Sequence, residues 1–200
     1  RIKSPIRNKR ELFDVGVAGP LAGFVVLLPF LFYGVAHSTP AAIEPITEGS
    51  PPLFAPALFL PGSCLALEAV TYLFHGPLPD NTVLNLHPFA LASWIGLFVT
   101  ALNLLPLAQL DGGHILYSVS ARAHRALGRW LWVALLAGTL LWPGWAVWAI
   151  LVLILGLRHP PLRDEERSLQ GHRRTLAAAA LILFLLCFMP KPLEIVPLAL

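Results

Sequence analysis

Long apolar runs, separated by short polar or basic stretches, dominate the hydrophobic pattern of this 200-residue chain. The four main apolar segments cover 12–36, 88–110, 130–157 and 175–189. A helix needs about 20 mostly apolar residues to cross the hydrocarbon layer of a bilayer. Because several segments approach or exceed that length, the pattern predicts an all-α integral membrane protein. We expect a polytopic helical bundle in which residues 1–200 form a single membrane domain.

Two apolar stretches contain interruptions that leave their structure open. The segment 56–74 is broken by Pro61-Gly62 and carries Glu68, which favours a re-entrant or interfacial segment over a full span. The segment 130–157 has Trp142-Pro-Gly-Trp145 in its middle. It is therefore either one long kinked span or a tight hairpin of two short helices.

Glycine and proline mark further features of the expected helices. Gly19 and Gly23 have the spacing of small residues that lets two membrane helices approach closely. His87-Pro88 predicts a helix start, because proline is favoured in the first turn. Pro106 should break or unwind the helix that precedes it, since it lacks a backbone N–H group.

Charge sets the orientation of these segments. Only 12% of the residues are charged and 56% are hydrophobic, whereas soluble domains carry roughly 25% charged residues. Nearly all lysines and arginines fall in 1–11, 122–129 and 158–174, so we expect these three regions to be cytoplasmic. Residues 37–55 and 75–88 contain none and should face the other side. This arrangement favours the hairpin for 130–157 and excludes a nucleic-acid-binding groove.

Asp111 is the strongest candidate for chemistry. It follows an apolar helix and a break at Pro106, and a carboxylate at membrane depth costs about 2.5–3.5 kcal/mol, so it usually marks a functional site. A carboxylate on an unwound segment can bind Zn²⁺ through oxygen. Gly112 and Gly113 permit close backbone approaches, and Asn103 places an amide inside the apolar helix. The alternative is that Asp111 simply caps a helix beginning at Gly112.

Other polar and aromatic residues have simpler explanations. His114 lies beside Asp111 and is either an outer partner of a ligand or a replacement ligand, and we favour the partner. Glu68 either faces water from an interfacial helix, which we favour, or marks an ion pathway. The two cysteines should be buried small hydrophobic residues. The tryptophans at 130, 132, 142, 145 and 148 are typical of interfacial anchors.

The segment Asn103-Leu-Leu-Pro106-Leu-Ala-Gln-Leu110-Asp111-Gly112-Gly113 resembles the Asn-x-x-Pro…Leu-Asp-Gly motif of the site-2 protease family. Ala18-Gly19-Pro20-Leu-Ala-Gly23 is similar to the glycine-rich helix start that follows the catalytic helix in many bacterial members. The resemblance covers most of residues 5–160 and is greatest to the bacterial and chloroplast branch. It implies an intramembrane zinc metalloprotease in which Asp111 is the third zinc ligand. Asn103, Pro106, Gly112 and Gly113 would then shape the site that holds an unwound substrate helix.

The chain departs from the family in one respect: none of its histidines is followed by Glu, so it contains no H-E-x-x-H. In the family this motif supplies two zinc ligands and the general base, and it precedes the Ala-Gly-Pro segment. The chain also starts with Arg1 rather than Met. We therefore expect the catalytic residues upstream of Arg1, in a longer metalloendopeptidase of which residues 1–200 alone are inactive.

The resemblance implies two partners, a membrane-protein substrate helix and the lipid bilayer, and leaves the oligomeric state open. We expect a bacterial inner (plasma) membrane rather than a chloroplast membrane. The alternative function is a noncatalytic pseudoprotease, or a transporter whose broken helix around Pro106 binds a polar solute or ion.

Overall fold

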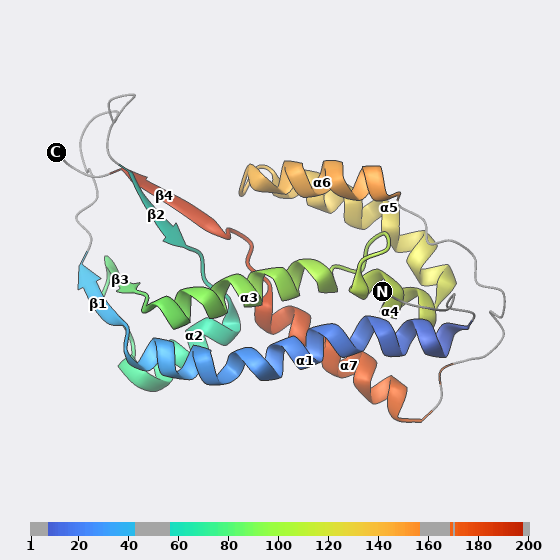
Figure 1. Cartoon of the computed structure of the whole chain (residues 1–200). Coiled ribbons are helices and arrows are strands. Elements are labelled where there is room, and N and C mark those ends of the chain that lie inside the picture. The colour runs from blue at the N-terminus through green and yellow to red at the C-terminus, as the bar shows by residue number, and fades with distance from the viewer. Residues whose placement is uncertain (1–7, 43–56, 157–168, 170, 198–200) are drawn as a thin grey trace.

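The computed structural model describes residues 8–42, 57–156, 169 and 171–197, and these are mostly helical. The long helices α1 and α3 lie side by side, with the strands at one end of the pair and α4 at the other (Figure 1). The helices are α1 (Lys9–Ala36), α2 (Leu65–His75), α3 (Pro88–Leu104), α4 (Asp111–Val119), α5 (Ala121–Gly138), α6 (Gly144–Leu155) and α7 (His172–Cys187). The strands are β1 (Thr39–Ala42), β2 (Ala57–Pro61), β3 (Thr82–Asn85) and β4 (Leu193–Pro197).

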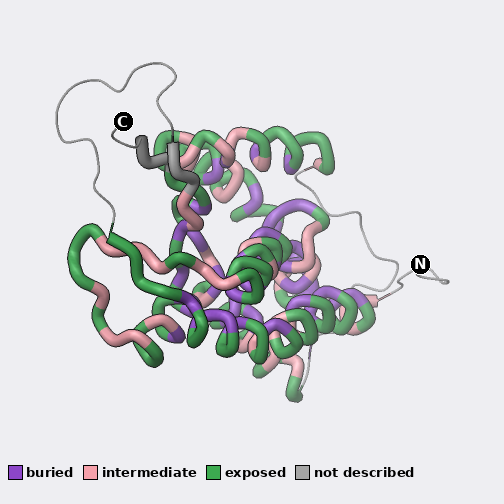
Figure 2. The backbone as a smooth tube through the Cα atoms, turned by 60° about the vertical axis from the view of Figure 1, so that its left-hand side comes forward, coloured by how far each residue is buried: buried purple, intermediate pink, exposed green. Residues whose placement is uncertain are grey.

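Helices α1 and α3 form the centre of the molecule. The Asn8 side chain caps α1 by accepting hydrogen bonds from the backbone N–H groups of Arg10 and Glu11. Leu31 and Leu97 are both fully buried in a core to which α1, α2, α3 and α7 contribute. Figure 2 shows the buried residues, in purple, gathered in the middle of the molecule where these helices meet. Both cysteines lie in the same core, which confirms that they are buried hydrophobic residues.

Four short strands correct the expectation of an all-α protein. β1 pairs with β3 and β2 with β4, each pair antiparallel. The stretch 56–74 is accordingly divided between β2 and α2. The Gly62 N–H donates to Pro192 O at 2.7 Å, directly beyond the β2–β4 ladder. Because the partner of β2 lies more than a hundred residues away in the sequence, the local pattern could not reveal this pairing.

The segment 88–110 is a helix followed by a break. α3 begins at Pro88, and the His87 side chain accepts a hydrogen bond from Phe89 N, which confirms the predicted helix start. The helix ends at Leu104, and the next helix begins only at Asp111.

Helices α5 and α6 form a helical hairpin, which agrees with the hairpin alternative for 130–157 over the described residues 130–156. The Trp132 indole donates to Ala149 O at 2.9 Å across the hairpin, and Trp145, which is 4% exposed, donates to Pro190 O at 2.9 Å. The tryptophans at 132, 142, 145 and 148 pack together in a second hydrophobic cluster. Trp145 is thus a core residue, whereas Trp132, Trp142 and Trp148 are partly buried and Trp130 is 70% exposed.

The outer surfaces of the helices are strongly apolar. Val26 of α1, Leu140 after α5 and Ile154 of α6 are 65%, 89% and 76% exposed. Exposed apolar surface of this extent marks contact with a membrane or another protein. Among the described residues, α1 is the one helix long and apolar enough to cross a membrane; α2, α3 and α6 are shorter apolar helices.

The contact between α1 and α3 gives a test of the fold. A Cβ at Gly34 would overlap the backbone of Ala90, whereas a Cβ at Gly23 would meet nothing within 4 Å. Gly34→Ala should therefore destabilise the protein by about 1–3 kcal/mol through overpacking. Gly23→Ala is the matched control and should be neutral or slightly stabilising, because alanine favours helix. Thermal unfolding in detergent measures both, and equal melting temperatures would contradict the packing described here.

Candidate functional site

The break between α3 and α4 is a compact turn built around Pro106. Leu105 has φ −53° and ψ 126°, the extended conformation favoured before proline. The Leu107 N–H donates to Leu105 O at 2.7 Å, and the Leu110 N–H donates to Leu107 O at 3.2 Å. Ala108 adopts the left-handed region with φ 51°. Pro106 thus ends the helix, and the turn returns the chain to begin α4.

Two hydrogen bonds connect this turn to the helical hairpin, one from a side chain of each partner. His124 of α5 is fully buried, and its Nε2 lies 3.2 Å from Ala108 O. The Gln109 amide donates to Leu155 O at the end of α6 at 3.3 Å. His124 lies in the basic stretch 122–129, and its contact with the turn was not expected from the sequence. No local signal distinguishes this histidine, because its partner lies in a turn sixteen residues earlier.

Gly112 and Gly113 pack directly on the carbonyl groups of the turn. A Cβ at Gly112 would overlap Leu104 O and lie 2.6 Å from Leu105 O. A Cβ at Gly113 would lie 2.5 Å from Ala108 O and 2.6 Å from Leu107 O. Both glycines are buried. The two glycines therefore allow α4 to approach the break closely, as their lack of a side chain predicted.

Asp111 is the first residue of α4 and is half-buried. Leu110 is the N-cap residue and makes no side-chain capping bond. Asp111 therefore does not cap α4 from outside, and the capping explanation is wrong. Its carboxylate forms no hydrogen bond to any residue within the described ranges.

Helix α1 lies against the start of α4 through its glycines. A Cβ at Gly16 would lie 3.1 Å from Asp111 O and 3.1 Å from the His114 Cβ. A Cβ at Gly19 would lie 3.9 Å from Asp111 Oδ2. The fold thus brings the Ala-Gly-Pro segment together with the Leu-Asp-Gly motif. Gly23 was expected to act with Gly19, but a Cβ there would meet nothing within 4 Å. The close contact with α4 is made at Gly16 instead, a position that the spacing of small residues did not indicate.

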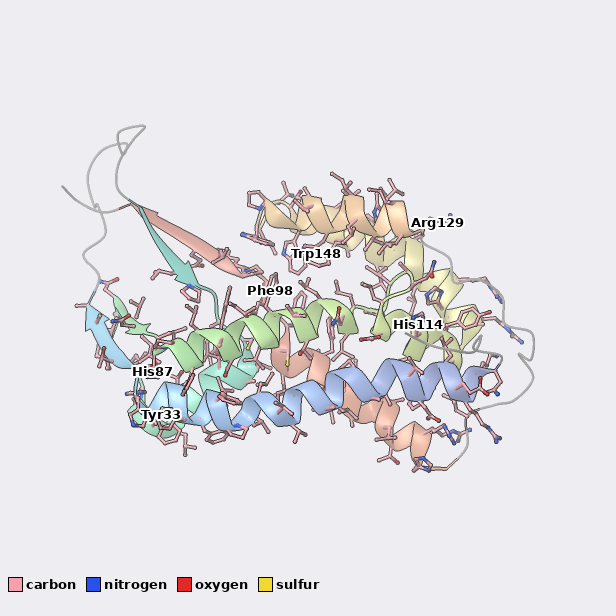
Figure 3. All side chains as sticks on the ribbon, in the orientation of Figure 1. Tyr33, His87, Phe98, His114, Arg129 and Trp148 are labelled. Atoms are coloured by element: carbon pink, nitrogen blue, oxygen red, sulfur yellow. The ribbon has the colours of Figure 1, made fainter. Side chains whose placement is uncertain are left out.

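The other predicted site residues surround the break without forming one cluster. Asn103 is exposed in the last turn of α3, and its amide makes no hydrogen bond to the part of the chain that the structure describes. Pro106 is half-buried in the turn. His114 is half-buried in α4, and Figure 3 shows it at the same end of the molecule as the break. Asp111 and His114 thus lie together against α1, while Asn103 faces outward.

The described residues supply part of a zinc site. Protein zinc sites use three or four protein ligands, among them carboxylate oxygens. Residues 8–42, 57–156, 169 and 171–197 contain no group of three or more His, Cys, Asp or Glu side chains that could hold a metal ion. What fits zinc here is a single half-buried carboxylate, Asp111, facing a glycine surface of α1 that leaves space beside it.

A helix broken at Pro106, with the Asp111 carboxylate at the start of the next helix, carries the Asn-x-x-Pro…Leu-Asp-Gly motif. The chain belongs to peptidase family M50, the site-2 protease family, whose model matches residues 2–137. This confirms the resemblance found in the sequence. The family is membrane-associated, and its peptidases depend on zinc.

Several plant proteins are similar to most of the chain. The probable zinc metalloprotease EGY2 of Oryza sativa subsp. indica, described as chloroplastic, is 29% identical over 199 residues, which are 98% of this chain and 35% of that protein. The probable chloroplastic zinc metalloprotease EGY1 of Oryza sativa subsp. japonica is 30% identical over 194 residues, 95% of this chain and 32% of that protein. EGY2 of Arabidopsis thaliana is 28% identical over 194 residues, with 96% and 34% covered. The chain spans about a third of the length of these relatives. No solved structure matches it.

The close contact of Gly112 with the turn predicts that a methyl group added at this position lowers the stability of the protein. In Gly112→Ala, the added Cβ must push α4 away from the carbonyls of Leu104 and Leu105, neither of which can move as a flexible side chain could. We expect a loss of about 1–3 kcal/mol in stability. Gly19→Ala, whose Cβ meets Asp111 Oδ2 at an ordinary 3.9 Å, serves as the control. Denaturation curves that coincide for the two variants would show that α4 tolerates displacement.

Proposed function

We propose that this chain is part of an intramembrane zinc metalloprotease that cleaves transmembrane segments of membrane proteins by means of metal-activated water. The observation that carries this proposal is the Asp111 carboxylate, half-buried at the start of α4 and facing Gly19 of α1. The M50 family assignment and the names of the relatives support the metalloprotease chemistry.

The residues of this chain would hold the metal and the substrate. Zinc, when bound, lowers the pKa of its water to about 7. Asp111 provides one anionic oxygen ligand, and by family resemblance two histidines and the glutamate of an H-E-x-x-H segment provide the others and the general base. The His114 side chain would lie near the ligand set as an outer partner.

A substrate helix hides its carbonyl groups in its own hydrogen bonds, so cleavage requires that it unwind. The break at Pro106 offers irregular backbone at the depth where an unwound substrate needs hydrogen-bond partners. Asn103, exposed one turn before the break, offers an amide donor and acceptor at the same place. Asn103 would therefore position substrate without touching the metal.

The proposed membrane arrangement is a polytopic bundle. Its support is the exposed apolar surface of the helices and the placement of the basic residues. The described basic residues of α1, α5 and α7 lie near one end of the molecule (Figure 1). That end would be cytoplasmic, while 1–7, 158–168 and 170 lie outside the described residues. The relatives are named as chloroplastic, and no comparison supports the bacterial inner membrane in preference.

The second candidate is a noncatalytic relative, either a pseudoprotease or a transporter that binds a polar solute at the broken helix. The observation in its favour is that the described residues contain no metal-binding cluster. The sequence of the complete protein separates the two candidates. An H-E-x-x-H on an apolar helix favours the protease, and its absence favours the noncatalytic relative.

We predict that residues 1–200 alone neither retain stoichiometric zinc nor cleave a membrane substrate, because they carry one proposed ligand. Metal analysis of the purified chain after dialysis tests this. A tightly held zinc would show that the chain contains further ligands, and His114→Ala would then be the first variant to examine.

In the complete protein, Asp111→Asn should keep the shape of the side chain and remove the charge that balances Zn²⁺. The loss of zinc affinity should exceed the roughly 10–100-fold cost of losing an outer partner of a ligand, and cleavage should fall with it. Asn103→Ala should retain zinc but cleave more slowly. Asp14→Asn is a control, because Asp14 is exposed and pairs with Arg173. Zinc content and substrate cleavage measured together decide the outcome, and a fully active Asp111→Asn protein would overturn the role of Asp111.

A further inference from the structure

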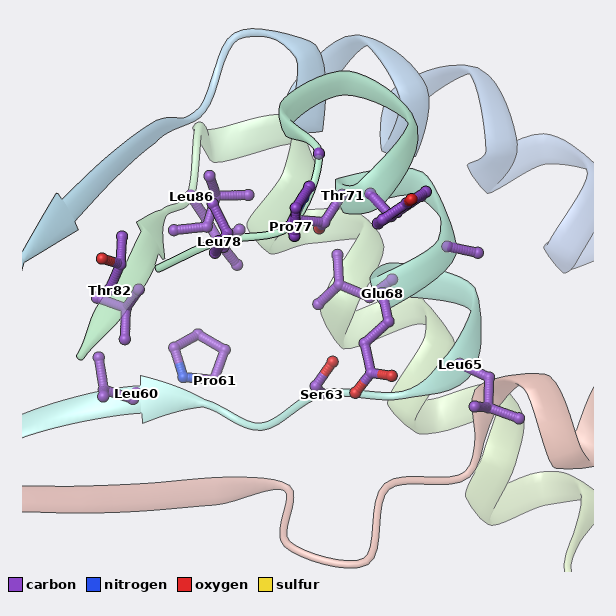
Figure 4. Close-up of a pocket in the computed structure, with 16 residues that line it drawn as sticks. Leu60, Pro61, Ser63, Leu65, Glu68, Thr71, Pro77, Leu78, Thr82 and Leu86 are labelled. Atoms are coloured by element: carbon purple, nitrogen blue, oxygen red, sulfur yellow. The ribbon is translucent and has the colours of Figure 1, made fainter. Parts of the chain in front are cut away.

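A cavity of about 660 Å³ lies near the strands, at the end of the molecule away from Asp111. Figure 4 shows Leu60 and Pro61 of β2 on one side of it and Thr82 of β3 on the other, with α2 forming a further wall. Most of the lining is apolar and comes from β2, α2, β3 and the residues that connect them. The polar side chains in the lining are Ser63, Glu68, Thr71, Tyr72 and Thr82.

The two strands beside this cavity each have an unpaired edge within the described residues. β2 pairs with β4, and β3 pairs with β1. Three consecutive residues of β3, Thr82 to Leu84, line the cavity. Successive side chains of a strand point to opposite faces. Because three consecutive residues of β3 line the cavity, the cavity meets the edge of the strand rather than one of its faces. An extended peptide can add to such an edge through main-chain hydrogen bonds.

Glu68 is the single charged residue in the lining of this cavity. It is exposed and forms no ion pair with any residue that the structure describes. In Figure 4 its carboxylate points toward Ser63, while most of the cavity wall is apolar. This combination fits a lysine or arginine, whose apolar stem packs on the wall while its charged group meets the carboxylate. The water-facing position expected for Glu68 is thus compatible with a binding role.

The cavity and Asp111 are separated by the length of α3. Leu86 lines the cavity just before α3 begins, and Asp111 follows the turn after it ends. Seventeen helical residues span about 25 Å at 1.5 Å per residue, comparable with the hydrocarbon thickness of about 30 Å. A segment that crosses the membrane beside α3 therefore has one flank at the cavity when its other end is near Asp111.

We propose that this cavity binds an extended, largely apolar peptide segment that carries a basic residue opposite Glu68. That this peptide segment is the non-cytoplasmic flank of the substrate rests on the proposed function. The binding of an extended peptide by the cavity does not depend on it. The cavity selects substrates by this flank, at a distance from the bond that is cleaved.

The test uses two fluorescein-labelled dodecapeptides of alternating threonine and valine, one with a central lysine and the other with a central glutamate. Binding to the detergent-solubilised protein is followed by fluorescence anisotropy at low and high salt. The lysine peptide should bind more tightly, and Glu68→Gln should weaken it by about twofold to fivefold, as expected for a partly exposed ion pair. Glu68→Lys should reverse the preference. Asp80→Asn, at an exposed acid near β3 that does not line the cavity, is the matched control and should change nothing.

Equal binding of the two peptides, or equal effects of Glu68→Gln and Asp80→Asn, would overturn the proposal. So would displacement of the lysine peptide by phosphatidylethanolamine at the same Glu68-dependent site, which would assign the cavity to the ammonium group of a zwitterionic lipid headgroup. Peptide binding requires neither zinc nor cleavage, so Asp111→Asn should leave it unchanged. A reversed peptide preference in Glu68→Lys, in a complete protein that cleaves no membrane substrate, would support peptide binding by the cavity and refute the proposed protease. Zinc-dependent cleavage by the complete protein, with an unchanged peptide preference in Glu68→Lys, would refute peptide binding by the cavity and support the protease.

Discussion

The contact of Gly112 and Gly113 with the carbonyl groups of the turn is the constraint on which the site depends. Breaking a helix inside a membrane domain leaves backbone groups without their usual partners, and that cost is large where water is scarce. Here the turn forms hydrogen bonds within itself and reaches His124 and Leu155 of the hairpin. Glycine lets the next helix begin against the break, which places Asp111 at a defined point.

Helix α1 completes this arrangement from the other side. Its glycines at 16 and 19 allow α4 to approach so closely that the Asp111 carboxylate faces the surface of α1. A larger residue at Gly16 would meet both the backbone of Asp111 and the side chain of His114. The position of the proposed ligand is therefore set by close backbone packing on two sides. This is the kind of support that a functional site needs if its geometry is to be rigid.

The same architecture would separate the two proposed functions along α3. The break and Asp111 lie at the basic end, where the proposed chemistry occurs. The strands, α2 and Glu68 lie at the other end, where a substrate flank would be selected. The strands matter for this division because they provide exposed backbone edges, which helices do not offer. Two short sheets in a mostly helical protein are thus consistent with recognition of an extended peptide.

The sequence by itself determined the features that depend on neighbouring residues. Pro106 ends a helix because it lacks an N–H group, His87-Pro88 starts one, and the Asn-Pro-Asp-Gly motif identified the family. The local Pro-Gly pair and the flanking charges favoured a helical hairpin over one kinked span, and the pairing of α5 with α6 decided between them. Only the tertiary structure decided the contacts between distant segments: the β2–β4 pairing, the His124 support of the turn, the burial of Trp145, and the exposure of Asn103. Each of these depends on backbone groups or surfaces brought together from far along the chain, which no local period in the sequence encodes.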